Sequence, residues 1–154
     1  MKKSQQLKIQ ISVREQRLTL KSGRKKVAAY PVSTSRFGLG SKEGSFKTPT
    51  GKFRIAEKIG DGMPAGTVFK SRRRVKATKK MLREDDLVMT RILWLDGLEP
   101  RNANTHNRYV YIHGTNHEEE IGTAASHGCV RMKNDDVLEL FDRVAEGTPV
   151  EITP

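Results

Sequence analysis

The residues best suited to chemistry lie close together between positions 109 and 131. This stretch holds Cys129, the only cysteine of the chain, and three of its four histidines. A free thiol has a pKa of about 8.5, so at neutral pH it needs a neighbouring base to become a nucleophile. A thiol that is close in sequence to imidazoles and to free backbone N–H groups is typical of nucleophilic catalysis. A buried, unreactive Cys129 is the plainer alternative.

Two imidazoles compete for the role of base. His127 is only two residues from Cys129, and an extended backbone would put both side chains on one face with little freedom to aim them at each other. His113 follows the apolar run Tyr109–Ile112, which predicts a buried strand ending at His113. Because His113 arrives from a separate strand end, geometry favours it, without excluding His127.

The elements that must position these residues are mostly strands. Alternating or apolar runs predict strands over 7–13, 18–20, 27–33, 53–59, 87–95, 109–112 and 148–152. A single helix is predicted over Asn134–Glu146, capped by Asn134 and stopped by Gly147. Its predicted apolar face consists of Val137, Leu138, Phe141, Val144 and Ala145. About eight strands and one main helix predict a mainly β fold, and the length of 154 residues predicts a single domain over 1–154.

Composition narrows the class of protein but not the reaction. No apolar run approaches the roughly 18 residues that a membrane span requires. The start, Met1–Gln6, is charged but is followed by alternating apolar and polar residues. A secretory signal has a continuous apolar run at this point, so none is expected in this chain. The net charge of +11 favours polyanionic surroundings.

Two loops are ambiguous. The glycines of 35–51 suggest a phosphate cradle, but no Gly-Lys-Ser/Thr ending follows, and turn chemistry explains them better. Residues 60–86 look irregular and contain the basic run Arg72–Lys80. That segment is either a solvated surface loop or a flap over the site, and the sequence leaves both open.

The motif His113-Gly114-Thr115, then Ile121-Gly122, then Ser126–Met132 resembles the L,D-transpeptidase catalytic domain. The similarity extends upstream through Tyr30–Thr34 and Phe46–Phe53 and downstream to Val150, so it covers nearly the whole chain. It implies a β-sandwich or flattened barrel with one main helix after the cysteine. Arg131 stands where the family often has Asn, and the gap from His113 to Ser126 is on the short side.

The resemblance also implies roles for individual residues. Cys129 would be the nucleophile and His113 the general base, with the carbonyl of Gly114 holding its second ring nitrogen. The N–H groups of His127, Gly128 and Cys129 would form the oxyanion hole. Three residues would bind substrate or order the site: Arg131, Ser126 and Tyr111. No cofactor and no metal are implied.

The implied reaction is acyl transfer on peptidoglycan stem peptides, as part of cell-wall biogenesis and cell shape. The acyl group would pass to an amine, making a 3-3 crosslink or another product; with water as acceptor the enzyme would be an L,D-carboxypeptidase. Members of the family act in the cell envelope, where acidic wall polymers could also be partners, while the missing leader leaves the cytoplasm open. The sequence does not indicate the oligomeric state.

Two further classes compete. A metal site could draw on His106, His113, His117, His127 and Cys129, but neither Cys-x-x-Cys nor His-Glu-x-x-His spacing is present, and His106 and His117 fit solvated loop positions. A nucleic-acid-binding module would suit the charge, yet Arg72–Lys80 contains no aromatic residue on which bases could stack. We therefore expect no nucleic-acid partner.

Overall fold

The computed structural model describes residues 6–154. The interpretation of Met1–Gln6 as a start without a secretory signal falls outside this range, apart from Gln6. Within the described residues, no helix combines the length and apolar character needed to cross a membrane.

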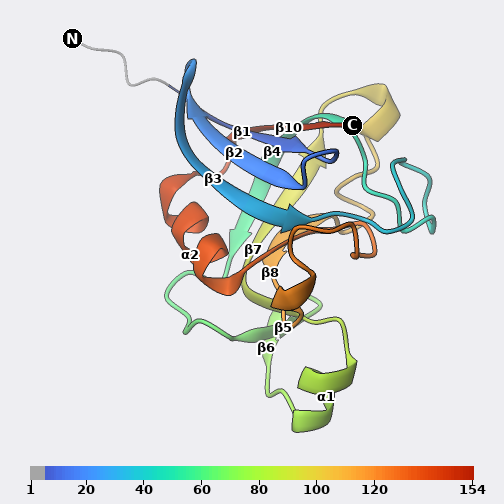
Figure 1. The fold of residues 1–154 in the computed structure, drawn as a ribbon, viewed down its shortest axis with the longest axis vertical. Coiled ribbons are helices and arrows are strands. Elements are labelled where there is room, and N and C mark those ends of the chain that lie inside the picture. The colour runs from blue at the N-terminus through green and yellow to red at the C-terminus, as the bar shows by residue number, and fades with distance from the viewer. Residues whose placement is uncertain (1–5) are drawn as a thin grey trace.

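Eight strands form a closed barrel, which confirms the mainly β prediction (Figure 1). They are β1 (Leu7–Ser12), β2 (Arg17–Ser22), β3 (Lys25–Ser33), β4 (Gly51–Ile59), β7 (Val88–Gly97), β8 (Tyr111–Gly114), β9 (Val130–Met132) and β10 (Pro149–Thr153). Around the barrel the order is β4, β10, β1, β2, β3, β9, β8 and β7, and β7 pairs with β4 to close it. β1 pairs in parallel with β10, and β8 with β9.

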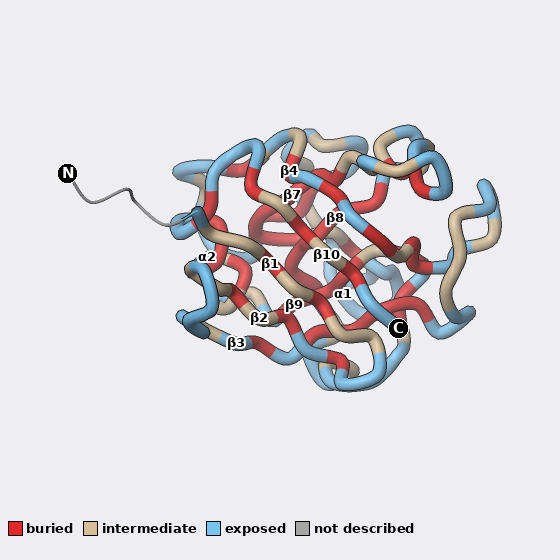
Figure 2. The backbone as a smooth tube through the Cα atoms, turned by 90° about the horizontal axis from the view of Figure 1, so that it is seen from above, coloured by how far each residue is buried: buried red, intermediate tan, exposed pale blue. Residues whose placement is uncertain are grey.

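The barrel interior and the main helix, α2 (Asn134–Arg143), share one hydrophobic core. Successive side chains of a strand point to opposite faces, which is why these strands alternate in sequence. From β8 only Ile112 joins the core. Tyr111 and His113 therefore project from the outer face of β8. Figure 2 shows buried stretches where the strands cross the middle of the molecule, and exposed stretches along the loops.

β8 begins later than the predicted strand over Tyr109–Ile112. Tyr109 has a φ of +57° and is 52% exposed, so it belongs to the turn before the strand. β8 then continues to Gly114, and His113 lies inside the strand rather than after its end. Pairing with β7 and β9 on either side fixes the direction of the His113 side chain.

The start of α2 differs from the prediction that Asn134 caps it. Lys133 occupies the cap position and makes no side-chain cap bond. The Asn134 amide is instead engaged at 2.8 Å by the carbonyl of Thr115 and at 2.6 Å by the hydroxyl of Thr90. Thr90, from β7, and Thr115, just after β8, therefore engage the amide that was predicted to cap the helix.

The end of α2 also lies earlier than the predicted Glu146. The helix stops at Arg143, and Gly147 serves the turn beyond it rather than the helix end. The buried face contains Leu140, which the prediction omitted, while Ala145 is exposed.

The segment 60–86 is more ordered than the irregular loop the sequence suggested, and that expectation is wrong. It forms β5 (Val68–Lys70), β6 (Arg73–Val75) and a short helix, α1 (Lys79–Glu84). β5 pairs with β7, so the hairpin extends the barrel sheet outward. Thr78 caps α1 by accepting a hydrogen bond from the N–H of Met81 at 3.1 Å. These elements make the projection at the bottom of Figure 1.

Candidate active site

Cys129 lies just before β9, on the wall of a hollow of about 380 Å³. Three segments line this hollow: Glu43–Phe46, Asn107–Val110 and His127–Cys129. The side chain packs against an outer hydrophobic cluster that includes Tyr111 and Trp94. The thiol therefore faces both an open hollow and the outer surface of β8.

The thiol of Cys129 is held by backbone groups. Its sulfur accepts the N–H of Tyr111 at 3.3 Å and lies 3.5 Å from the carbonyl of Tyr109, to which the S–H can donate. Burial raises the pKa of the thiol to about 11, aided by the Asp86 carboxylate, while the Tyr111 N–H and the cations Arg131 and Arg108 lower it. At neutral pH the group is a thiol, and it needs a base.

His113 is poised as a neutral acceptor. Its ring is buried, with 3% exposure, and burial lowers its pKa, while the Gly114 carbonyl and Asp86 raise it and Arg131 lowers it further. Nδ1 lies in short contact with the carbonyl of Gly114, which can only accept, so Nδ1 carries the proton. Nε2 therefore has a free lone pair for proton transfer.

The parallel ladder of β8 and β9 relates the two candidate groups. His113 is in register with Arg131, and Ile112 with Val130. Because Ile112 and Val130 face the core, His113 and Cys129 share the outer face as diagonal neighbours. Cys129 precedes β9 by one residue, so the two side chains project from adjacent segments of this face.

His127 is engaged on both ring nitrogens. Arg36 Nη2 lies 3.0 Å from Nε2, and Asp86 Oδ2 lies 3.1 Å from Nδ1. A guanidinium only donates, so Nε2 accepts from Arg36 and Nδ1–H donates to Asp86. His127 in this arrangement has no free lone pair to accept a proton from Cys129. The structure thus favours His113 over the alternative that the spacing left open.

The loop between Ser126 and Cys129 is braced from within. The Ser126 hydroxyl donates to the carbonyl of Cys129 at 2.6 Å and accepts the N–H of Gly128 at 3.2 Å. Thr48, from the glycine-punctuated loop, donates to the carbonyl of Gly128 at 3.0 Å. Ser126 is 1% exposed, so it supports the loop from inside.

Two glycines of the motif are required by space or by backbone conformation. Gly128 has a φ of +120°, which side chains disfavour. A Cβ on Gly114 would lie 2.3 Å from Oδ1 of Asn134 and 2.7 Å from the carbonyl of Met89. Gly114 therefore lets α2 and β7 approach the strand that carries His113.

Arg131 is a buried cation with two acidic neighbours. It is 2% exposed, and its Nη2 lies 2.8 Å from Oδ2 of Asp86. Its Nη1 lies 3.6 Å from a carboxylate oxygen of Glu120 and makes no hydrogen bond among the described residues.

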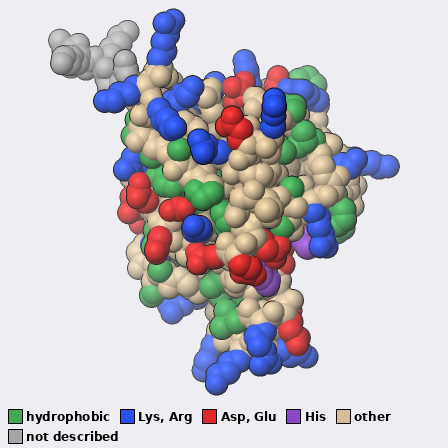
Figure 3. Space-filling view, viewed as in Figure 1, with side chains coloured by type: hydrophobic (Ala, Val, Ile, Leu, Met, Phe, Trp, Pro, Cys, Tyr) green, Lys and Arg blue, Asp and Glu red, His purple; other side chains and the backbone are tan. Residues whose placement is uncertain are grey.

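Arg72 reaches from the β5–β6 turn to the aromatic residues around Cys129. Its guanidinium lies 4.8 Å from the ring centre of Trp94 and 5.0 Å from that of Tyr109, and it donates to the hydroxyl of Tyr111 at 3.0 Å. The hairpin is thus tied to the site rather than being a solvated loop. Other Lys and Arg side chains gather at the tip of this projection (Figure 3).

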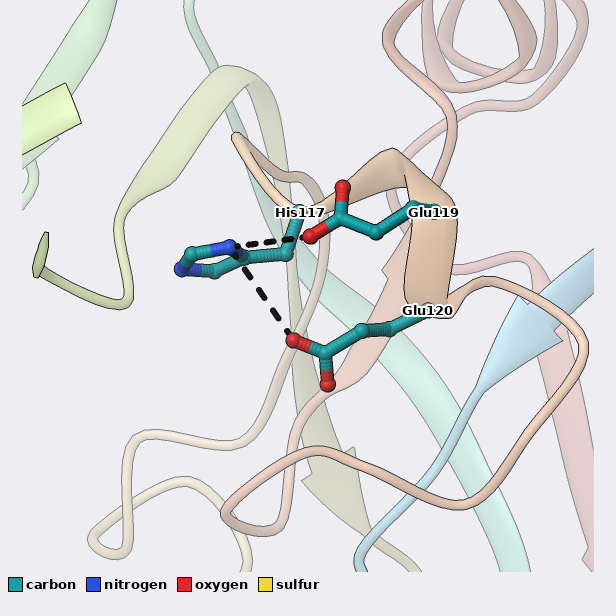
Figure 4. A group of neighbouring side chains, drawn as sticks. All are labelled: His117, Glu119 and Glu120. Atoms are coloured by element: carbon teal, nitrogen blue, oxygen red, sulfur yellow. Dashed lines mark ion pairs between the residues drawn. The ribbon is translucent and has the colours of Figure 1, made fainter. Parts of the chain in front are cut away.

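The histidines suggested for a metal site do not converge. His106 stacks on Trp94, with ring centres 3.9 Å apart. His117 points toward Glu119 and Glu120, with Nδ1 to carboxylate distances of 3.4 and 4.0 Å (Figure 4). Its Nε2 lies 2.9 Å from the carbonyl of Asp85, so His117 links α1 to the loop after β8.

Three residues of the site were not predicted from the sequence: Asp86, Arg36 and Thr48. Asp86 is the last of three consecutive acids, Glu84–Asp86, and nothing local distinguishes it from its neighbours. Thr48 lies within the Phe46–Phe53 motif and could have been found from that resemblance. Arg36 carried no sequence signal.

A family model described as the L,D-transpeptidase catalytic domain (YkuD) matches residues 6–152. A putative L,D-transpeptidase of Bacillus subtilis, YqjB, is 51% identical over 49 residues, which is 32% of this chain and 28% of the relative. The putative L,D-transpeptidase YkuD of Bacillus licheniformis is 60% identical over 43 residues, or 28% of this chain and 26% of the relative.

Solved structures share the fold at low identity. An L,D-transpeptidase from Xylanimonas cellulosilytica superposes with a TM-score of 0.64 and 18% identity, covering 99% of this chain and 63% of that one. L,D-transpeptidase 3 of Mycobacterium tuberculosis, in complex with a faropenem-derived adduct, superposes with a TM-score of 0.61 and 16% identity. The match covers 96% of this chain and 60% of that one. The chain thus spans less than two thirds of these relatives.

Proposed function

The chain belongs to the L,D-transpeptidase family, and from that premise we propose that it is a cysteine acyltransferase acting on peptidoglycan stem peptides. The observation that carries the proposal is that Cys129, the residue before β9, and His113, on β8, lie on the same outer face of the sheet. A protonated thiol, Cys129, shares that face with a buried neutral imidazole, His113, whose Nε2 is free to accept. This pair is what acyl transfer through a thioester requires.

In the proposed reaction, rotation of the Cys129 side chain brings the sulfur to His113. Nε2 takes the thiol proton as the sulfur attacks the carbonyl carbon of the third stem residue. The tetrahedral intermediate collapses by breaking the C–N bond, and His113 returns the proton to the departing amine of the terminal D-amino acid. The acyl group remains on Cys129 as a thioester.

The developing oxyanion needs fixed donors, each typically worth roughly 10²–10³ in rate. We assign this role to the loop 127–129, with one refinement of the sequence expectation. The N–H of Gly128 is bonded to Ser126, so a hole in this conformation relies on the N–H groups of His127 and Cys129. The open hollow beside Cys129 would admit the substrate.

The residues expected to bind substrate fall into two groups. Arg131 and Ser126 are buried and bonded within the site, which favours a supporting role over direct contact. Tyr111 lies nearer the substrate path: its N–H holds the sulfur and its hydroxyl is bound by Arg72.

The second half of the reaction transfers the acyl group to an acceptor. An amine of another stem would give a 3-3 crosslink, while water would make the enzyme an L,D-carboxypeptidase. The same acyl-enzyme serves both. Peptidoglycan places the proposed reaction in the cell envelope, and the basic projection in Figure 3 suits acidic wall polymers as additional partners.

The proposal is tested by intact-mass analysis after incubation with imipenem, a compound with which a related solved L,D-transpeptidase forms a complex. We expect one covalent adduct on Cys129, absent in Cys129→Ala. A wild-type protein that stays unmodified, with its fold intact by circular dichroism, would contradict the proposal. Muropeptide products then separate crosslinking from trimming.

A further inference from the structure

Asp86, in the three-residue connection between α1 and β7, reaches into the candidate site without touching the sulfur. One carboxylate oxygen, Oδ2, lies 2.8 Å from Nη2 of Arg131 and 3.1 Å from Nδ1 of His127. Its two partners flank Cys129 in sequence, one on each side. A single oxygen therefore connects a residue before Cys129 with one after it.

The two bonds are directional; the Arg131 donor is buried, while the His127 donor lies at the surface. Arg131 is 2% exposed and belongs to β9, where it is in register with His113. His127 donates through Nδ1–H because Arg36 occupies its other nitrogen. Charge-assisted bonds of this length are among the stronger hydrogen bonds in proteins.

We propose that Asp86 is a positioning residue for acylation: it holds Arg131 and His127 so that the thiol loop, Ser126–Cys129, keeps the geometry that the reaction needs. The inference rests on the proposed function, because it concerns the rate of the same reaction. The residue that positions the thiol loop would thus come from the segment after α1, outside the motif that contains His113 and Cys129.

The electrostatic surroundings support a negative charge at this position. His113 faces two charges, Asp86 and Arg131, which act on its pKa in opposite directions. Burial raises the pKa of Asp86, but the hydrogen bond and charge of Arg131, with His113 and His127, lower it below its ordinary value. Asp86 is thus a carboxylate throughout the neutral range.

Two further charged groups contact the partners of Asp86 rather than Asp86 itself. Glu120 approaches Arg131 from the loop after β8, and Arg36 approaches His127 from the loop after β3. With Asp86 neutralised, the buried Arg131 charge would face His113 with only the longer Glu120 contact to offset it. The imidazolium that forms when His113 takes the thiol proton would then be less stable.

Asp86 is delivered to the site by a docked helix. Asn116, in the loop after β8, donates to the carbonyls of Leu82 and Asp85 at 2.9 and 2.8 Å, and accepts the N–H of Leu87 at 3.0 Å. These bonds satisfy the end of α1 and set the backbone on both sides of Asp86. The placement of the carboxylate is therefore built into the fold.

The test compares Asp86→Asn with Asp85→Asn, which removes the same charge from the preceding residue; the ion pairs with Arg131 and His127 belong to Asp86 and not to Asp85. The probe is imipenem, and the readout is the second-order rate of adduct formation on Cys129 across pH. We expect Asp86→Asn to acylate about 10- to 100-fold more slowly, the loss typical of a small misplacement. The acid limb of its profile should also shift to lower pH, because His113 loses a stabilising charge. Asp85→Asn should match the wild type within about twofold.

The outcomes separate this inference from the proposed function. A wild type that forms no adduct contradicts the function itself. A wild type that acylates, with Asp86→Asn equal to it in rate and pH profile, overturns the positioning role alone. If Asp86→Asn melts below the assay temperature, Asp86→Glu replaces it. That variant keeps the charge but displaces it, so a slowed rate with an unshifted acid limb supports the role, and a wild-type rate overturns it.

Discussion

Nη2 of Arg36 lies 3.0 Å from Nε2 of His127, and this contact bears on which of two histidines is the better candidate base. With Nε2 accepting from Arg36 and Nδ1 donating to Asp86, His127 has no site for the thiol proton. His113 keeps Nε2 free because its Nδ1 is held by the Gly114 carbonyl.

The first prediction concerns these two histidines. His113→Gln should lower the rate of Cys129 acylation by about 10²–10⁴-fold, the usual contribution of a general base. His127→Gln keeps a side chain that can accept from Arg36 or donate to Asp86, so we expect a loss of about tenfold or less. Stopped-flow acylation by imipenem measures both. A larger loss in His127→Gln than in His113→Gln would contradict the assignment.

The second prediction is the pH dependence of acylation. Burial lowers the pKa of His113, so the imidazole loses its proton below its ordinary value of about 6.5. The rate should rise with pH through that lowered pKa and then stay level. Burial raises the pKa of Cys129 to about 11, so free thiolate is a very small fraction at neutral pH and the base-assisted rate should dominate there.

The control for the pH profile is His113→Gln. Without the imidazole, only thiolate reacts, and the rate should increase about tenfold per pH unit across the neutral range. A wild-type profile that instead rises between about pH 7 and 9, near the pKa of a free thiol, would indicate reaction without base assistance.

The third prediction concerns Gly114. A methyl group there would lie 2.3 Å from Oδ1 of Asn134 and 2.7 Å from the carbonyl of Met89, and backbone cannot retreat cheaply. Gly114→Ala should reduce the free energy of unfolding by about 1–3 kcal/mol, the usual cost of overpacking. Denaturant titration measures it. Gly40→Ala is the matched control, since the atoms nearest to its Cβ all belong to the flexible Lys47 side chain; an equal loss there would refute the packing argument.

The barrel could be predicted from the sequence because each of its longer strands has a local pattern, either alternating apolar and polar residues or an apolar run. Ile9, Ile11, Leu18 and Leu20 alternate with polar residues, and all four are buried. The candidate nucleophile could also be singled out, since a lone cysteine within Ser-His-Gly-Cys is a local pattern.

Residues that depend on partners distant in sequence were not predictable. Asn134 has the sequence position of a cap, yet Thr90 and Thr115 engage its amide. Thr90 can do so because β7 is irregular there, with φ of +74° at a β-branched residue, and no local rule anticipates that conformation. Asp86 could not be chosen among three acids until the fold placed Arg131 beside it.

The fourth prediction tests whether Arg72 fastens the β5–β6 hairpin over the site. Two contacts of its guanidinium, with Trp94 and Tyr109, contribute about 0.5–1 kcal/mol each where the cation is partly exposed. Arg72→Ala should therefore speed amide hydrogen exchange in 68–75 by about 5- to 30-fold, as expected for 1–2 kcal/mol. Phe69 stays buried in the outer cluster, so the hairpin loosens without detaching.

Arg73→Ala is the control for this experiment, because Arg73 lies on the same hairpin with an exposed side chain. It removes the same charge without removing a contact to the aromatic residues, so its exchange rates should stay within about twofold of the wild type. If both variants speed exchange equally, the basic side chains act through net charge alone, and the contacts of Arg72 do not hold the hairpin in place. If only Arg72→Ala does, the cation that lies against Trp94, Tyr109 and Tyr111 joins the projection to the face that carries Cys129.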